Sequence, residues 1–425
     1  MKIRIKIKWK YSELIVFLLT IMPIIDFING YFQNTFISLI GPLYRLILIL
    51  LSMMVLIKSK NSEFVLFTFL ISGYFLMHDI IYMAMDKNNN SLSVIMDKTV
   101  KYMYVIILSE TLCLLVKRNR LTITVIDEIF DRLSWLFPVL LFIPKLMGAK
   151  NTSMYTESGY KGFFYSGNAV SITMVALLFV SMCFLYKRPC FRNSVRVFLC
   201  LTVQLLIGAK TNYIFSALII GYFALKSINL TRNNNLKTLT TLILLVFCGF
   251  FAIKYCFSDE IAKILARQRY IYSSYNANFI QYLTSNRSIR IDEQLRHFLS
   301  NPFYILFGMG YRQTLDNNFV EMDYFDLLFR YGALVTVVLI IYYLTKLREG
   351  LRKKDTYLML YLILQAFATF AGHVFCDAMT GTILALLIAH IRCTVVDRRS
   401  EIKDAPRGNC YTKLWNTRRN LQSGA

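Results

Sequence analysis

The sequence predicts an all-α, polytopic membrane protein, and both its composition and its pattern of apolar runs support this fold class. Of the 425 residues, 56% are hydrophobic and 17% are charged, and the mean hydropathy is +0.48. A soluble core of this size does not bury so many apolar side chains. Apolar runs long enough to cross a hydrocarbon layer of about 30 Å recur along nearly the whole chain. We therefore predict one multi-pass domain over residues 1–425, with about twelve transmembrane helices.

The predicted spans follow one another with short, basic connections mostly on one side. They cover residues 11–29, 34–57, 64–85, 97–116, 121–144, 167–186, 195–209, 211–225, 238–254, 331–345, 356–371 and 376–391. The first span follows KIRIKIKWK, and because no small-residue cleavage site comes after it, we predict a retained helix. The nine cysteines are scattered without CxxC spacing, which predicts small hydrophobic residues and not disulfides or metal ligands.

Residues 195–225 admit two interpretations, one overlong helix or two short helices that meet near Gly208. A single helix would put the later basic connection KLREGLRKKD and the basic tail, residues 392–425, outside the cell. Lys and Arg favour the cytoplasmic side, so the charge bias favours two helices and two cytoplasmic termini. Each helix would reach only about 22 Å, which places Lys210 at their junction, in a cavity below the outer surface. The net charge of +23 is then explained by basic residues on the cytoplasmic side, which are also suited to contact anionic lipid headgroups, and nucleic acid is not expected as a partner.

The connection of residues 255–330 is predicted to be the one large extracytoplasmic loop. Within it, NRSIRIDEQLRHFL predicts a basic helix that starts after Thr284 and Ser285, both acceptable N-caps. Its apolar stripe consists of Ile291, Leu295, Phe298 and Leu299, and one flank consists of Arg287, Arg290, Gln294 and His297. Arginines beside a buried edge are suited to clamp phosphate, and the alternative is an interfacial helix whose arginines touch lipid headgroups. Arg296 points elsewhere and is expected to pair with Asp292.

Carboxylates gather between this helix and the next span. Glu321, Asp323 and Asp326 follow a turn that contains Gly308-Met309-Gly310. A carboxylate at the rim of a cavity is able to accept a hydroxyl proton, and its alternative role is to neutralise nearby arginines. Within the first two spans, Asp26 and Arg45 are expected to pair with each other, because an isolated charge inside a membrane is expensive.

Five segments, in this order, resemble the O-antigen polymerase and O-antigen ligase superfamily: GYKGFFYSGNAVS (159–171), IGAKTNY (207–213), the arginine of SNRSIRIDEQL, FGMGY and VEMDYFDLLFRYG. The resemblance covers roughly residues 145–335. It implies a GT-C-like glycosyltransferase of polysaccharide biosynthesis, acting on undecaprenyl-diphosphate-linked sugars at the outer face of the bacterial cytoplasmic (inner) membrane. Where ligases carry a histidine after the glycine turn, this chain has Glu321 and Asp323, which favours an O-antigen or capsule polymerase over a lipopolysaccharide ligase.

The resemblance also implies roles for individual residues. Carried over by position, these residues are Arg287, Lys210 and Lys161. As a mechanistic hypothesis, Arg287 and Lys210 would stabilise the departing diphosphate, with Arg290 and Lys161 assisting, and Asp323 or Glu321 would be the base for the acceptor hydroxyl. His297, on the same flank of the basic helix as Arg287 and Arg290, is a further expected substrate-binding residue. No metal or other cofactor is expected, because a diphosphate is already a good leaving group. The expected partners are the undecaprenyl-diphosphate-linked oligosaccharide and membrane lipids, with a chain-length regulator and a flippase as candidates. A lipid-linked oligosaccharide flippase is the alternative function, against which the large outer loop and the lack of internal repeats argue.

Overall fold

The structure of the protein is a computed structural model. It describes residues 11–32, 35–59, 61–85, 92–148, 160–227, 236, 238–241, 243–244, 255, 258–274, 278–310, 320–352 and 355–404. The regular elements of these residues are all helices, with no β-strand among them. In chain order they are α1 (Tyr11–Tyr31), η1 (Phe36–Leu39), α2 (Ile40–Lys58), α3 (Ser62–Met85), α4 (Leu92–Lys117), α5 (Ile123–Leu146), α6 (Gly167–Lys187), α7 (Phe191–Ile207), α8 (Lys210–Ser227), α10 (Ser258–Ser274), α11 (Phe279–Thr284), α12 (Arg287–Leu299), α13 (Pro302–Phe307), α14 (Asp323–Leu351), α15 (Leu358–Phe370) and α16 (Ala378–Asp404).

Six of these helices are long and apolar enough to cross a membrane, namely α1, α2, α3, α4, α6 and α14. The helix α15 and the first part of α16 are shorter apolar helices. These helices indicate a membrane-embedded protein, as the composition predicts. Every predicted span except residues 238–254 coincides with a helix of the structure, whereas that span falls mostly outside the described residues.

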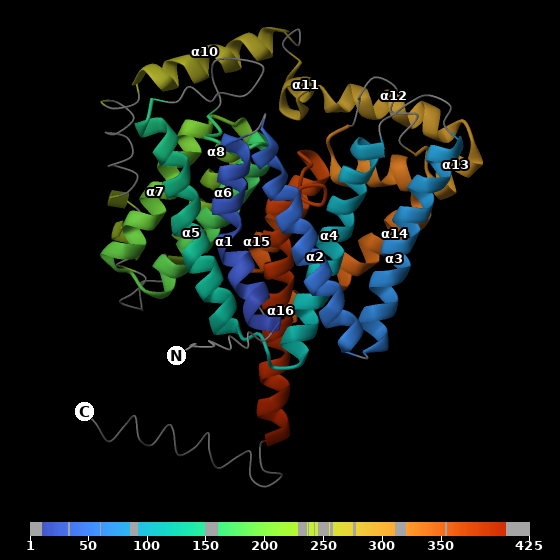
Figure 1. Cartoon of the computed structure of the whole chain (residues 1–425). Coiled ribbons are helices and arrows are strands. Elements are labelled where there is room, and N and C mark those ends of the chain that lie inside the picture. The colour runs from blue at the N-terminus through green and yellow to red at the C-terminus, as the bar shows by residue number, and fades with distance from the viewer. Residues whose placement is uncertain are drawn as a thin grey trace, which may run out of the picture.

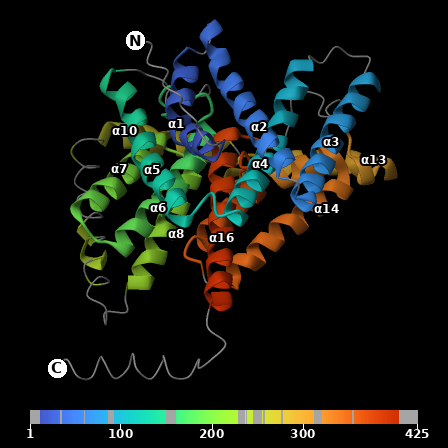
Figure 2. The same ribbon diagram turned by 60° about the horizontal axis from the view of Figure 1, so that its bottom comes forward.

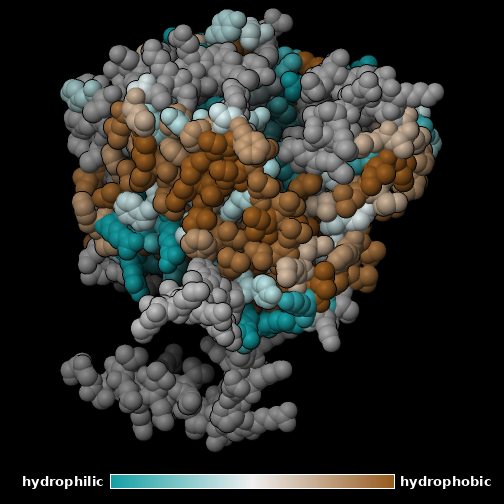
Figure 3. Space-filling model, viewed as in Figure 1, coloured by the Kyte–Doolittle hydropathy of each residue, from teal (hydrophilic) through white to brown (hydrophobic). Residues whose placement is uncertain are grey.

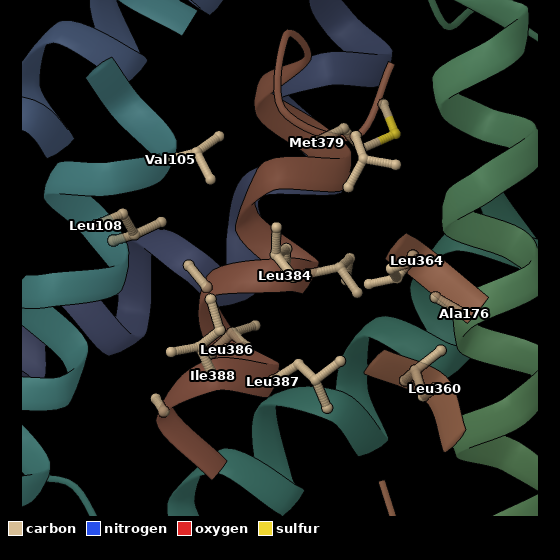
Figure 4. Packing of buried hydrophobic residues seen from close by; sticks show 14 of the residues in the cluster. Val105, Leu108, Ala176, Leu360, Leu364, Met379, Leu384, Leu386, Leu387 and Ile388 are labelled. Atoms are coloured by element: carbon tan, nitrogen blue, oxygen red, sulfur yellow. The ribbon is translucent and has the colours of Figure 1, made fainter. Parts of the chain in front are cut away.

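The centre of the bundle is α16, which packs against α4, α5, α6, α14 and α15. In the turned view it lies between α14 on one side and the group of α5 to α8 on the other (Figure 2). All side chains from Ile383 to Ala389 are fully buried. Figure 4 shows Leu384 and Ile388 of α16 lying between Leu108 of α4 and the α15 residues Leu360 and Leu364. A helix that is apolar on all sides is suited to such a position, because it has no face to present to water.

The helices α1, α2 and α3 lie at the periphery and expose apolar side chains. On α2, the exposed apolar residues lie along one side of the helix and are Ile40, Leu43, Leu46, Ile47, Leu50, Met54 and Ile57. Figure 3 shows the resulting hydrophobic band across the middle of this face, with hydrophilic residues below it. An outward apolar stripe on a long helix is suited to contact lipid, so these helices form part of the membrane-facing surface.

Helices α10, α11, α12 and α13, here called the cap layer, lie across one end of the bundle (Figure 1). The connections from α2 to α3 and from α4 to α5 lie at the opposite end. These connections carry basic residues, among them Lys58, Arg118 and Arg120.

The helix α14 is kinked, and the segment that follows α13 packs against the kink. Gly332 has φ 83° and ψ 173° inside α14, a conformation essentially restricted to glycine. A Cβ atom at Gly332 would overlap the carbonyl oxygen of Leu306, so the close approach also requires glycine. The amide of Met309 donates to the carbonyl of Phe329 at 2.7 Å, which joins the cap layer to the first half of α14.

Candidate functional site

The first contact of the site joins the cap layer to the start of α14. Arg287 is the first residue of α12, and its Nη2 donates to Glu321 Oε2 at 3.0 Å. The Arg287 side chain is 10% exposed, whereas that of Glu321 is 40% exposed. The Arg287 Nε is buried and has no hydrogen-bond partner among the described residues. A buried guanidinium with an unused donor is able to bind a further anion.

The turn before Arg287 corrects one sequence prediction. Thr284 and Ser285 were expected to cap the basic helix, but Thr284 ends α11 and Ser285 is the C-cap of that helix. The N-cap of α12 is Asn286, which makes no side-chain capping bond. Ser285 and Asn286 both adopt left-handed backbone conformations, with φ of 54° and 68°. Such consecutive left-handed residues reverse the chain sharply, a conformation that spacing and propensity do not reveal.

Lys210 provides a second positive charge, at the break between α7 and α8. The predicted division into two helices is confirmed, because α7 ends at Ile207 and Gly208 adopts a left-handed conformation with φ 70°. Lys210 then starts α8. Its Nζ donates to the carbonyl of Tyr282 and lies 4.2 Å from the centre of the Tyr282 ring. In the part of the chain that the structure describes, no carboxylate pairs with Lys210, and the charge that acts on it is that of Arg287.

Tyr282 was not among the predicted site residues, although it connects α10, α11 and α8. Its hydroxyl donates to Gln268 Oε1 at 3.0 Å, and its ring packs edge-on against Tyr272 at 5.4 Å. Through its carbonyl and its ring it holds Lys210. A tyrosine in an outer loop is ordinary at a membrane interface, so no signal in the sequence distinguishes it.

Asp323, a predicted base, is fully buried and bound to backbone. Its Oδ1 accepts from the amide of His373 at 2.8 Å, and its Oδ2 accepts from the amides of Val374 and Phe375 at 2.6 Å and 2.8 Å. These three hydrogen bonds tie the carboxylate to the backbone of residues 373–375. Asp323 therefore fixes the turn between α15 and α16 beside Glu321, while its role as a base stays a prediction.

The same turn approaches Glu321 closely. Glu321 has a φ of 63° and Gly372 a φ of 67°, so both loops turn through left-handed residues. A Cβ atom at Gly372 would overlap the carbonyl oxygen of Glu321. The charge of His373 also reaches Glu321, which adds a histidine of the α15–α16 turn to the site.

The electrostatics of the site follow from its excess of positive charge. Burial alone would raise the pKa of Glu321, but the charges of Arg287, His373 and Arg290 hold that pKa below its usual value. Burial and the charge of Arg287 lower the pKa of Lys210, which lies between two predicted spans, to about 8. Arg287 shifts the pKa values of both Lys210 and Glu321, and Arg290 also shifts that of Glu321. These four residues therefore form one electrostatic group. Such a group is able to bind a multiply charged anion.

Two of the predicted substrate-binding residues, His297 and Lys161, have no contact or electrostatic effect that links them to this group among the described residues. His297 is exposed near the other end of α12, where its ring lies 5.8 Å from that of Tyr304. Lys161 lies in the connection before α6, and its Nζ donates to the carbonyl of Tyr165 at 3.1 Å. The neighbouring Tyr160 amide donates to the carbonyl of Leu206, which places this connection beside the end of α7. Their binding roles stay predictions.

Within the described residues, no group of three or more His, Cys, Asp or Glu residues is arranged to hold a metal ion. Comparison of the chain with protein-family models, curated proteins and solved structures found no match. The site is therefore interpreted from its own geometry and charges.

Proposed function

We propose that this chain is a polymerase of bacterial surface polysaccharide, either O-antigen or capsule. It would transfer a growing glycan from undecaprenyl diphosphate to a lipid-linked oligosaccharide repeat unit. The observation that carries the proposal is a buried Arg287 with an unused Nε donor among the described residues, in one electrostatic group with Lys210, Arg290 and the carboxylate of Glu321. A diphosphate is the kind of ligand that such guanidinium and ammonium donors match. The substrate class comes from the resemblance of the five segments to the polymerase and ligase superfamily.

The proposed reaction is a single displacement at the anomeric carbon of the growing glycan. An acceptor hydroxyl oxygen forms a bond to that carbon, while the bond from the carbon to the diphosphate oxygen breaks and its electron pair stays on the diphosphate. Arg287 and Lys210 stabilise the charge that develops there. Glu321 takes the hydroxyl proton. The products are a glycan longer by one repeat unit, still on its lipid, and free undecaprenyl diphosphate, with inversion at the anomeric carbon.

Glu321 fits the role of base better than Asp323. Its side chain is 40% exposed and bonds only one guanidinium among the described residues, whereas Asp323 is fully buried and accepts three backbone amides. When a diphosphate engages Arg287, the guanidinium stabilises Glu321 less, so the pKa of Glu321 rises toward its ordinary value. Binding of the donor would thereby make Glu321 a stronger base when it is needed.

The proposed location is the bacterial cytoplasmic membrane, with about twelve spans in a GT-C-like arrangement, both termini in the cytoplasm and the cap layer outside. The basic connections at the opposite end of the bundle support this orientation. A membrane-impermeant thiol reagent tests it on intact spheroplasts. A cysteine introduced at Leu299, which is 57% exposed on α12, is expected to be labelled, and one introduced at Arg120 is not. The opposite pattern would place the site in the wrong compartment.

A deletion strain tests the function directly through its product profile. Single repeat units that accumulate on the lipid carrier at the outer face are expected, and expression of the wild-type chain restores the polymer. Units trapped at the cytoplasmic face would instead identify a flippase. Finished polymer that is not attached to its lipid core would identify a ligase.

A further inference from the structure

Three aromatic side chains on α3 form a ladder beside the kink of α14. Tyr74, His78 and Tyr82 recur every four residues and therefore share one face of the helix. The ring of His78 stacks on Tyr74 with 5.8 Å between the ring centres and on Tyr82 with 4.5 Å. We call these three residues the α3 ladder. Each of them carries a polar atom that lies against the cap layer or α14.

Each rung of the ladder bonds one backbone carbonyl. Tyr74 Oη donates to the carbonyl of Tyr331 at 2.8 Å, His78 Nε2 lies 2.7 Å from that of Phe307, and Tyr82 Oη donates to that of Gly308. Because a carbonyl only accepts, the Nε2 of His78 carries a proton in this contact. These carbonyls stand at the end of α13 and beside the non-helical Gly332, where regular helical bonding is interrupted. The ladder supplies donors that the local backbone lacks.

A buried ion pair holds the ladder in place. Asp79 follows His78 and is 1% exposed, and its Oδ1 lies 3.3 Å from His78 Nδ1. Its Oδ2 accepts from Arg330 Nη2 at 2.6 Å and from the hydroxyl of Thr99. Asp79 thus joins α3, α4 and α14 directly beside His78.

The segment held by the ladder leads to both sides of the candidate site. The amides of Met309 and Gly310 donate to the carbonyls of Phe329 and Arg330, at 2.7 Å and 3.1 Å. The ring of Phe298, on the helix that begins with Arg287, packs on Phe329 with 5.4 Å between centres. The first half of α14 begins two residues after Glu321. Met309 lies in the same buried apolar cluster as Phe298 and Phe329, so the segment packs against both α12 and the start of α14.

We infer that Tyr74, His78 and Tyr82 are positioning residues of the candidate site. They bond the backbone at the end of α13 and at the kink of α14, and so determine how Arg287 and Glu321 meet. Their effect on glycan transfer rests on the proposed function, whereas their effect on the position of the cap layer does not. The two effects are therefore measured separately.

Hydrogen exchange measured by mass spectrometry on the purified full-length protein tests the positioning. Tyr82→Phe removes one hydroxyl and is expected to speed exchange of the Met309 and Gly310 amides about tenfold. Tyr361→Phe is the matched control, because the Tyr361 hydroxyl also donates to a buried carbonyl, that of Tyr343 at 2.8 Å, but joins α15 to α14. Exchange in residues 302–310 is expected to be unchanged in the control. Unchanged exchange in Tyr82→Phe, or an equal rise in both variants, overturns the inference.

A pair of amide substitutions tests the His78 bond itself. In His78→Gln the side-chain nitrogen reaches about as far as Nε2, whereas in His78→Asn it is too short to reach the carbonyl of Phe307. We expect near-normal exchange in His78→Gln and about tenfold faster exchange of residues 302–310 in His78→Asn. Equal exchange rates in His78→Gln and His78→Asn would show that the bond from His78 to the carbonyl of Phe307 does not hold this segment.

The rate of polymer formation then separates the two proposals. In membranes, kcat is expected to fall about tenfold in His78→Asn and to recover in His78→Gln, at equal protein levels. If exchange changes as expected but the wild-type chain forms no polymer, the positioning stands and the proposed function fails. If polymer forms normally in all variants and exchange in residues 302–310 is unchanged, the positioning role fails and the proposed function stands.

Discussion

Arg287 offers the sharpest test of the candidate site. Arg287→Ala removes a guanidinium that bonds Glu321 at 3.0 Å and has a second, unused buried donor at Nε. Loss of one preorganised donor to a developing anion lowers a rate about 10²-fold to 10³-fold. Because Arg287 offers two donors, we expect a loss of about 10³-fold in the rate of glycan transfer. Arg287→Lys keeps the charge but not the planar fork, and is expected to recover at most about a tenth of the wild-type rate.

The assay uses membranes from the deletion strain that express each variant at equal levels. Labelled lipid-linked repeat units are added, and the initial rate of dimer formation is read from products separated by size. Arg296→Ala is the matched control on the same helix, since Arg296 is 81% exposed and pairs with Asp292 at 2.9 Å. An exposed pair of this spacing contributes only about 0.3–0.5 kcal/mol, so the rate should change less than about twofold. A normal rate for Arg287→Ala, or an equal loss in the control, would refute the reasoning.

A double variant separates catalysis from simple charge pairing. If Arg287 and Glu321 served only to neutralise each other, Arg287→Ala combined with Glu321→Ala would restore much of the rate lost in either single variant. If each acts on the substrate, the double variant remains at least as slow as the slower single variant. Recovery in the double variant would show that the contact is structural.

Three further predictions address other residues of the site. The pKa of Lys210 is lowered to about 8, so this side chain loses its positive charge as the pH rises through 8. Because a neutral amine does not attract a phosphate, the KM for the lipid-linked donor should rise over the same pH range, and Lys210→Arg should remove this rise. Asp323→Asn replaces one of the two carboxylate oxygens that accept backbone amides with an NH2 group, which only donates. It is expected to lower the free energy of unfolding by about 2–3 kcal/mol, measured by thermal melting in detergent, and to abolish polymer formation. Gly332→Ala places a Cβ against the carbonyl of Leu306 and should cost more than about 2 kcal/mol, whereas Gly221→Ala, with open space around its Cβ position, should not.

Much of the helical layout was predictable, because it depends on local hydropathy and charge. The break before Lys210 was predicted because one helix over residues 195–225 would be overlong and would put the later basic connections outside, and the left-handed Gly208 ends α7 there. The pairing of Asp26 with Arg45 is confirmed at 2.6 Å. These features arise from neighbouring segments or from the strong cost of an unpaired charge in an apolar environment.

The features that were not predictable depend on backbone contacts between distant segments. Asp323 resembles a candidate base in the sequence, and only the fold shows the amides of residues 373–375 around it. Tyr282 has no local signature either, because tyrosine is common in outer loops. The ladder bonds carbonyls more than 220 residues away, such as the bond from His78 to Phe307. The twelve spans and the GT-C-like arrangement stay predictions.

The arrangement of the charges explains why the site would use two separate structural elements. Lys210 belongs to the membrane-embedded bundle, whereas Arg287 belongs to the cap layer. Without an anion, the two positive charges repel each other, as the effect of Arg287 on Lys210 indicates. A diphosphate between them would replace this repulsion with two attractions, at the place where Lys210 already contacts Tyr282 of the cap layer. Donor binding would thereby strengthen the contact between the cap layer and the bundle, while Glu321 loses part of its bond to Arg287 as the acceptor hydroxyl needs a base.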